Sequence, residues 1–373
     1  MSHAGPDVEF DNQVLDADGN VVAPERVPDC SDEEFVEMYR WMKFARRFDE
    51  RGVSLQRQGR MGTFSALTGH EAALVGSEAA LADDDWLVPY YRDHAATMAH
   101  GLPPERILQY YMGHEAGSIV PEDVNVFPIS ITIGGHLPHA VGLAHAAKLR
   151  GTDEVFCCYF GDGATSEGDF HEALNFAGVF DTPNVFFCMN NQWAISTPVE
   201  QQMATDTIAQ KATAYGFEGV RVDGTDPLAV YNVTREAAAR AREDDPADGE
   251  RRPTLVEAVL YRVGAHNTTD DPSNYHRETD AADLERWRDH DPLPRFETFL
   301  RESGRLDDER VAAIDEWVEE ELERAVDAAE ATTPDPDELF EFAYADQPSR
   351  VREQQAELAA LRERYGDDAL LED

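Results

Sequence analysis

The middle of the chain alternates between short unbroken apolar runs and longer stretches in which apolar residues recur at helical spacing. Unbroken runs of five or six apolar residues are typical of parallel strands buried on both faces, whereas helical spacing is typical of a helix that buries one side. Strands are predicted at 155–160, 185–189, 219–222 and 254–262, and helices at 169–180, 205–215 and 227–242. This alternation predicts an α/β fold with a mostly parallel sheet and helices on both faces.

The regions on either side of this series have a less regular pattern. The segment Ser31-Asp32-Glu33-Glu34 resembles a helix N-cap followed by acidic residues in the first turn, and apolar residues follow at helical spacing to about Arg51. Helices are also predicted at 68–81, 104–113 and 138–149, a strand at 84–90, a loop at 114–136, and charged helices beyond 290. We therefore expect an N-terminal arm at 1–30, an α/β domain with a helical end at 31–345, and a helical tail at 346–373.

Charge excludes several classes of function. The 373 residues include 75 acidic and 32 basic ones, which gives a formal net charge of −43. A general nucleic-acid binder needs Lys and Arg to neutralise phosphates, and a protein that docks on anionic membranes needs them as well. No stretch approaches the roughly 20 apolar residues of a membrane span. The N-terminus also lacks the basic-then-apolar order of a signal peptide.

The same composition indicates a cellular environment. Dense like charges repel at ordinary salt, but at about 1 M salt the screening length falls to about 3 Å. The chain is therefore interpreted as adapted to a high-salt cytoplasm; the plainer alternative is an acidic soluble protein. Three of the four cysteines, Cys157, Cys158 and Cys188, lie inside apolar runs, which indicates reduced core thiols in a cytoplasmic protein.

Candidate chemistry follows two neighbouring predicted strands. The turn Gly161-Asp162-Gly163 comes directly after the first strand, and Asn190-Asn191 ends the second. If these strands are parallel neighbours, the Asp carboxylate and the Asn carbonyl meet at the carboxyl edge of the sheet. Such oxygen ligands suit Mg²⁺, and the glycines let a phosphate approach the backbone. These residues predict a site for Mg²⁺ and a diphosphate, although a lone Gly-Asp-Gly is often a plain turn.

Longer motifs indicate a family. Residues 161–170 and 190–198, the Tyr91-Arg92-Asp93 segment and the loop 264–275 resemble the alpha subunit of the first component of 2-oxo acid dehydrogenases. That family includes the pyruvate and branched-chain enzymes, and the resemblance covers about residues 10–345. It implies the three-layer thiamine-diphosphate-binding fold, with thiamine diphosphate and Mg²⁺ as cofactors.

The resemblance also implies roles for individual residues. Asp162 and Asn191 would hold Mg²⁺ by their side chains, and Trp193 by its backbone carbonyl. Contacts to thiamine diphosphate would come from Tyr91, Arg92, Ile131, Ile133, Asp162, Gly163, Ala164, Asn191 and His266. His266 would also assist acyl transfer to a lipoyl group. The plainer alternatives are an exposed loop pair for Tyr91-Arg92, simple core for the two isoleucines and interface packing for Trp193.

Some positions depart from the family pattern, and one group is missing. His70 stands where relatives usually carry Gln or Glu, so it is assigned no role and is interpreted as structural, as are His136 and His139. Met189 replaces a basic residue of some relatives, and Asn267 replaces the regulatory Ser of mitochondrial ones. The Glu that faces the aminopyrimidine ring of the cofactor comes, in this family, from a separate beta subunit.

The resemblance therefore implies an alpha2beta2 heterotetramer bound to a lipoyl acyltransferase core, with an alpha chain that is inactive alone. The expected reaction is oxidative decarboxylation of a 2-oxo acid. Whether the substrate is pyruvate or a branched-chain acid stays open. The alternatives are an acetoin dehydrogenase alpha subunit and a non-catalytic subunit of the same fold.

Overall fold

The computed structural model describes residues 10–243, 252–276, 278–333, 335–341 and 344–367. A five-stranded sheet in the order β1-β2-β3-β7-β6 lies at its centre, and every neighbouring pair in it is parallel. Its strands are β1 (Trp86–Val88), β2 (Phe156–Gly161), β3 (Asn184–Asn190), β6 (Glu218–Asp223) and β7 (Thr254–Val259). A separate antiparallel pair, β4 (Trp193–Ala194) and β5 (Thr197–Pro198), follows β3.

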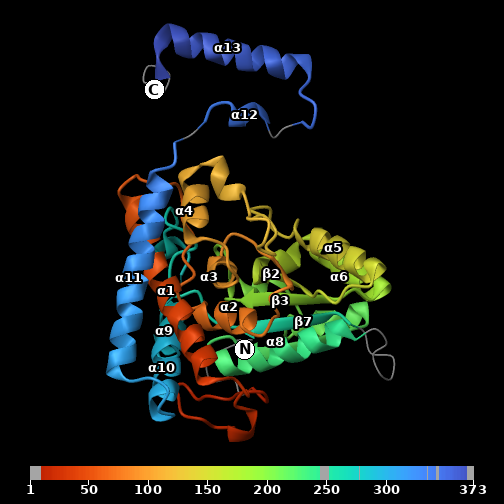
Figure 1. The fold of residues 1–373 in the computed structure, drawn as a ribbon. Helices are drawn as coiled ribbons and strands as arrows, with labels where there is room; N and C mark the ends of the chain where they lie inside the picture. The colour runs from red at the N-terminus through yellow and green to blue at the C-terminus, as the bar shows by residue number, and fades with distance from the viewer. Residues whose placement is uncertain (1–9, 244–251, 277, 334, 342–343, 368–373) are drawn as a thin grey trace.

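Helices cover both faces of the sheet, and the strand side chains divide between two cores (Figure 1). Along β2, Cys157 and Tyr159 join the large core, whereas Cys158 and Phe160 join a smaller core on the other face. The large core includes residues of α1 (Asp32–Arg57), α2 (Glu71–Glu78) and α8 (Pro227–Arg242). The smaller core includes residues of α5 (Leu137–Arg150) and α6 (Gly168–Phe180). The predicted three-layer α/β fold is confirmed.

Element types are predicted better than element ends. The predicted strands correspond to β1, β2, β3, β6 and β7, and most predicted helices are present. Helix α1 has the predicted N-cap at Ser31, which forms a capping box with Glu34, but the helix continues to Arg57 instead of ending near Arg51. It passes through Gly52, where an added Cβ would come within 2.7 Å of the Phe64 ring, so the glycine serves close packing. The predicted helix at 205–215 is a 3₁₀-helix over Ala209–Tyr215 only.

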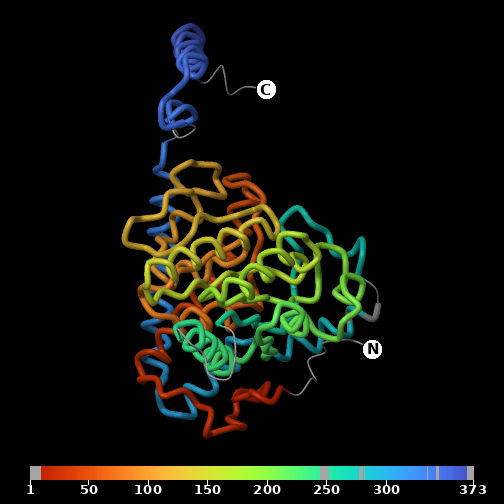
Figure 2. Tube along the Cα trace, turned by 90° about the vertical axis from the view of Figure 1, so that its right-hand side faces the viewer, coloured from red at the N-terminus to blue at the C-terminus, as the bar shows by residue number. Residues whose placement is uncertain are grey.

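The remaining elements are mostly short. They include α3 (His94–Ala99), which the pattern did not predict, α4 (Pro104–Met112), α7 (Val199–Gln202) and α9 (Glu278–Arg288). Short 3₁₀ turns occur at Pro24–Arg26, Glu115–Ser118, Asp162–Ser166 and Pro272–Asn274. Toward the C-terminus follow α10 (Pro292–Glu302), α11 (Asp308–Glu330), α12 (Glu338–Glu341) and α13 (Ser349–Tyr365). Helices α12 and α13 stand away from the body in both views (Figures 1 and 2).

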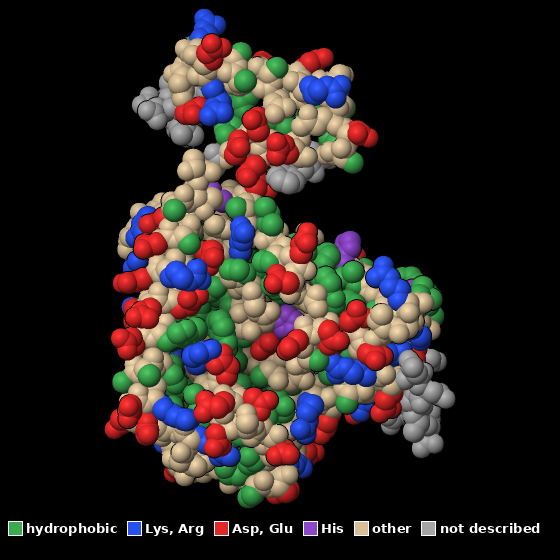
Figure 3. Space-filling view, in the orientation of Figure 1, with side chains coloured by type: hydrophobic (Ala, Val, Ile, Leu, Met, Phe, Trp, Pro, Cys, Tyr) green, Lys and Arg blue, Asp and Glu red, His purple; other side chains and the backbone are tan. Residues whose placement is uncertain are grey.

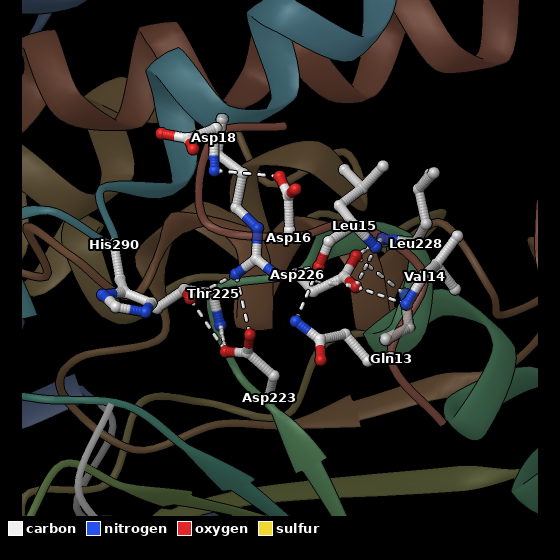
Figure 4. A network of polar contacts seen from close by, with 12 residues as sticks. Gln13, Val14, Leu15, Asp16, Asp18, Asp223, Thr225, Asp226, Leu228 and His290 are labelled. Carbon is white, nitrogen blue, oxygen red and sulfur yellow. Dashed lines mark hydrogen bonds and ion pairs between the residues drawn. The ribbon is translucent and has the colours of Figure 1, made fainter. Parts of the chain in front are cut away.

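The described part of the N-terminal arm is held against the body by a buried polar network (Figure 4). One oxygen of Asp226 accepts hydrogen bonds from the backbone N–H groups of Val14 and Leu15, both at 2.8 Å. Its other oxygen caps the first turn of α8. Arg295 of α10 donates to Asp223 at 2.7 Å and to the Leu15 carbonyl. The division of the chain at 1–30, 31–345 and 346–373 stays a prediction.

Acidic side chains are spread over the face shown in Figure 3. The four cysteines are free, and Cys157, Cys158 and Cys188 are buried, as predicted for core thiols. Within the described ranges, no helix combines the length and the apolar character needed to cross a membrane.

Candidate functional site

A cavity of about 400 Å³ opens at the carboxyl edge of the sheet. The register pairs Gly161 of β2 with Met189 of β3, so the turn after β2 and the Asn pair that ends β3 lie side by side, as predicted. The cavity lining includes every predicted site residue: Tyr91, Arg92, Ile131, Ile133, Asp162, Gly163, Ala164, Asn191, Trp193 and His266. Residues from five separate segments of the chain thus meet at one place.

Asp162 begins the 3₁₀ turn after β2, and it is only 1% exposed. Burial raises the pKa of its carboxyl group to about 6, although a hydrogen bond from Gln202 opposes that rise. The Gln202 amide donates to Asp162 over 2.8 Å, and no described Lys, Arg or His forms an ion pair with this carboxylate. A buried acid without a cationic partner is suited to hold a cation.

The turn is shaped for close approach to the backbone. A Cβ atom on Gly163 would come within 2.9 Å of the Ala194 Cβ atom, so a side chain at this position would need its neighbour to move. The next residue, Ala164, is buried beside it in the cavity wall. Backbone N–H groups of such a turn can donate to phosphate oxygens.

Asn191 lies just beyond β3 and is 4% exposed. Its amide oxygen accepts the Trp193 N–H over 3.2 Å, and its amide nitrogen lies 3.1 Å from Nε2 of His70. His70 is fully buried, and burial lowers the pKa of its imidazole to about 3, so the ring is neutral near pH 7. His70, to which the sequence assigns no site role, thus contacts the amide of a residue that lines the cavity.

Arg92 is the main buried cation at the cavity, with 1% of its surface exposed. Its guanidinium donates to the backbone carbonyls of Ala66 and His266, the latter over 2.8 Å. Among the described residues it forms no ion pair with a carboxylate. A buried guanidinium that meets only neutral groups can bind an incoming anion in two-pronged geometry.

His266 lies on the loop after β7, at the same edge of the sheet, as predicted. Its Nδ1 is 3.4 Å from an Arg92 nitrogen, and its backbone N–H donates to Asp270 over 2.7 Å. Burial and the positive charges of Arg92 and Arg262 lower the pKa of the imidazole to about 4. The ring is therefore neutral near pH 7 and can accept a proton.

Ile131 and Ile133 stand at the cavity with 63% and 42% of their surface exposed. The alternative that they are simple core is therefore wrong. Ile195 lines the same cavity and is 56% exposed. These three side chains give the cavity an apolar rim around a polar floor.

Several residues of the site were not predicted from the sequence motifs. Tyr90, Gly134, His136, Glu167, Ala194 and Ile195 also line the cavity. Gln202 and Arg262 stand behind it: Gln202 bonds to Asp162, and Arg262 donates to the Ile195 carbonyl over 2.7 Å. The Nε2–H group of His136 donates to the Tyr159 carbonyl over 2.7 Å, which holds the ring against β2. Only the position of Arg262 at the end of a predicted strand could have indicated it.

The donor set fits one oxygen-bound cation beside one anion. Asp162 and Asn191 offer side-chain oxygens to a cation, while Arg92 and the backbone at Gly163 offer donors to an anion. The described residues contain no cluster of three or more His, Cys, Asp or Glu side chains suited to a metal ion. A cation bound here would therefore take most of its ligands from the anion and from water, which is the usual behaviour of Mg²⁺.

Comparison with known proteins gives the family. The family described as dehydrogenase E1 component matches residues 39–337. The alpha subunit of 3-methyl-2-oxobutanoate dehydrogenase from Mycobacterium tuberculosis is 42% identical over 353 residues, which is 93% of each chain. The alpha subunit of the pyruvate dehydrogenase E1 component from Staphylococcus aureus is 40% identical over 344 residues, 92% of this chain and 90% of that one. The chain described here belongs to the dehydrogenase E1 component family.

Proposed function

We propose that the chain is the alpha subunit of a 2-oxo acid dehydrogenase E1 component. It acts with a beta subunit in the oxidative decarboxylation of pyruvate or a branched-chain 2-oxo acid and in reductive acylation of a lipoyl group. One observation carries this proposal: a buried Asp162 without a cationic partner and a buried Arg92 without a carboxylate partner, among the described residues, line the same cavity. Membership of the family implies thiamine diphosphate, whose diphosphate and Mg²⁺ would supply the missing charges.

The proposed cofactor contacts follow from the donor set. Asp162, Asn191 and the Trp193 carbonyl would hold Mg²⁺, and the N–H groups of Gly163 and Ala164 would bind diphosphate oxygens. Tyr91, Arg92 and His266 would also contact the diphosphate, and Ile131 and Ile133 would lie against the aminopyrimidine ring. When bound, thiamine diphosphate supplies a nucleophilic carbon and an electron sink for decarboxylation.

His266 is the residue to which we assign proton movement. Because its imidazole is neutral near pH 7, it can accept a proton during acyl transfer and return it afterwards. Arg92 holds the His266 carbonyl and so fixes the loop that carries the ring. We infer that His266 serves the lipoyl-dependent step more than decarboxylation itself.

A partner completes the proposed site. The exposed isoleucines at the rim would lose contact with water when a second subunit covers the cavity mouth, which is a favourable change. We propose that this partner is the beta subunit in an alpha2beta2 assembly, and that the assembly binds a lipoyl acyltransferase core. Free, buried thiols are consistent with a reducing cytoplasm, and the charge of −43 with high salt.

The decisive experiment is co-purification with the beta subunit in molar potassium chloride, followed by a substrate panel with an artificial electron acceptor. Pyruvate, 3-methyl-2-oxobutanoate and acetoin form the panel, and the separate alpha chain is the control. Turnover of a 2-oxo acid by the assembly alone supports the proposal. Turnover of acetoin only, full activity of the separate chain, or no cofactor binding by the assembly would each overturn it.

A further inference from the structure

His70 precedes α2, far in sequence from the motifs of the cavity, yet it touches one of them. We propose that His70 is a positioning residue, whose imidazole holds the Asn191 amide with its oxygen free to face a cation. This inference rests on the proposed role of Asn191 as a Mg²⁺ ligand. It goes beyond that role by naming His70 as the group that fixes the orientation of the Asn191 side-chain amide.

Two contacts fix the orientation of the amide. On one side the Trp193 N–H lies 3.2 Å from Oδ1 of Asn191, and on the other side His70 Nε2 lies 3.1 Å from Nδ2. A backbone N–H can only donate, so it needs the amide oxygen. The amide nitrogen can also only donate, so it needs the lone pair of an unprotonated Nε2. Both contacts therefore require a neutral His70 with its proton on Nδ1, a buried atom that has no hydrogen-bond partner among the described residues.

The orientation matters because the two ends of an amide differ in chemistry. The amide oxygen has two lone pairs, of which the Trp193 N–H takes one and leaves one for a cation. A flipped amide would turn its NH₂ group toward the cation, and that group has no lone pair to offer. The imidazole therefore selects the ligating orientation without touching the metal, as outer partners of metal ligands commonly do.

Burial makes this selection strong. His70 is fully buried and Asn191 is 4% exposed, so water cannot readily replace the imidazole as the acceptor for the amide nitrogen. Without the imidazole, a buried N–H group would be left unpaired in the ligating orientation. A hydrogen-bond acceptor at position 70 is thus the required property, and a bulky apolar group is not a substitute.

Two variants distinguish a need for a hydrogen-bond acceptor at position 70 from a need for a side chain of similar volume. His70→Leu fills a similar space without an acceptor, whereas the side-chain oxygen of His70→Gln can still accept from Asn191. Mg²⁺ is titrated by calorimetry into the beta-subunit assembly saturated with thiamine diphosphate, and thermal unfolding is recorded without Mg²⁺. We expect His70→Leu to weaken Mg²⁺ binding by about 10- to 100-fold, as outer partners of metal ligands do. His70→Gln should stay within about threefold, with similar unfolding temperatures.

Asp162→Ala is titrated in parallel, so that failures can be told apart. If it leaves Mg²⁺ affinity unchanged, the proposed cation site itself is wrong. If it abolishes binding while His70→Leu binds like the parent, only the positioning role is overturned. Equal losses for Leu and Gln would mean that His70 matters for packing alone. Should the Leu variant not assemble, His70→Met replaces it, because its flexible chain adapts to tight space.

Discussion

Two buried arginines, Arg295 and Arg92, solve the same physical problem in opposite ways. Each is only 1% exposed, and each carries a charge that is costly to remove from water. Arg295 finds Asp223 at 2.7 Å and Asp226 at 3.8 Å, so the fold itself neutralises it. Arg92 donates to two backbone carbonyls and lies beside a neutral imidazole, without a carboxylate partner among the described residues.

The two sets of partners distinguish Arg295, whose charge stabilises the fold, from Arg92, whose charge is available to a ligand. Burial favours the neutral form of Asp223, yet the Arg295 guanidinium holds the pKa of Asp223 below its usual range. That network links α10 to β6 and to the N-terminal segment. Around Arg92 none of the described residues supplies the corresponding anion, which is what a binding site for an anionic ligand requires.

The comparison of the two arginines predicts that substitution of Arg295 has the largest effect, a loss of stability. Arg295→Met should destabilise the protein by about 3–5 kcal/mol, because Asp223 and Asp226 would remain buried without a cation. Urea denaturation of the cofactor-free assembly, followed by circular dichroism, measures this loss. A midpoint within error of the parent would show that the network contributes no stability.

The next largest effect is expected at Asp162. Asp162→Ala removes the charged group proposed to hold Mg²⁺ and should weaken thiamine diphosphate binding by about 100-fold, comparable to about 2.7 kcal/mol. Asn191→Ala should weaken it less, because an amide carries no charge. Calorimetry on the assembled protein with Mg²⁺ provides the affinities, and unchanged values for Asp162→Ala would rule out the metal assignment.

Arg92→Met is the matched counterpart of Arg295→Met. It should change the stability of the cofactor-free assembly by only about 1 kcal/mol, because no buried acid loses its partner. Thiamine diphosphate affinity should nevertheless fall by about tenfold or more, since charge-assisted bonds to phosphate are lost. The contrast between the two arginines would disappear if Arg92→Met unfolded the protein as readily as Arg295→Met.

The variant His266→Ala tests the proposed role of His266, which lies beside Arg92, by measuring two enzymatic activities. Decarboxylation assayed with an artificial acceptor should stay within about threefold of the parent. Overall activity that depends on lipoyl transfer should fall by about 100-fold, in the range expected when a general acid–base group is removed. Both assays use one assembled preparation, and parallel losses or parental rates in both would remove His266 from the proposed step.

The smallest expected effect is a dependence on pH. Because the folded protein lowers the pKa of His266 from 6.5 to about 4, the unfolded chain binds more protons between these values. Stability from this group is thus fully present above about pH 6.5 and is lost as pH falls toward 4. His266→Asn should reduce the loss by about 1 kcal/mol, after discounting for partial exposure. Urea midpoints at pH 7 and pH 4.5 for both proteins measure the difference.

The sequence predicts the centre of the sheet well because Phe156–Phe160 of β2 and Val185–Met189 of β3 are unbroken apolar runs, typical of strands buried on both faces. The sequence does not predict α3, because polar residues of this helix are buried and the helical spacing of apolar residues is lost. One of them, His94, is hydrogen-bonded to Asp49 over 3.0 Å. The cavity follows from motifs that directly follow strands. The contact of Gln202 with Asp162 and that of His70 with Asn191 could not be predicted, because the partners lie 40 and 121 residues apart in the sequence, respectively.

The Arg295 network also constrains the order in which the molecule can form. Its bond to the Leu15 carbonyl joins residues 280 positions apart, so it closes a loop that contains the entire sheet. Closing so long a loop early costs chain entropy that no local contact repays. Leu15 is synthesised long before α10, so its bond to Arg295 cannot form until α10 has been made. We therefore expect Leu15 to be fixed in place late, after the strands that lie between it and Arg295 in the sequence have paired.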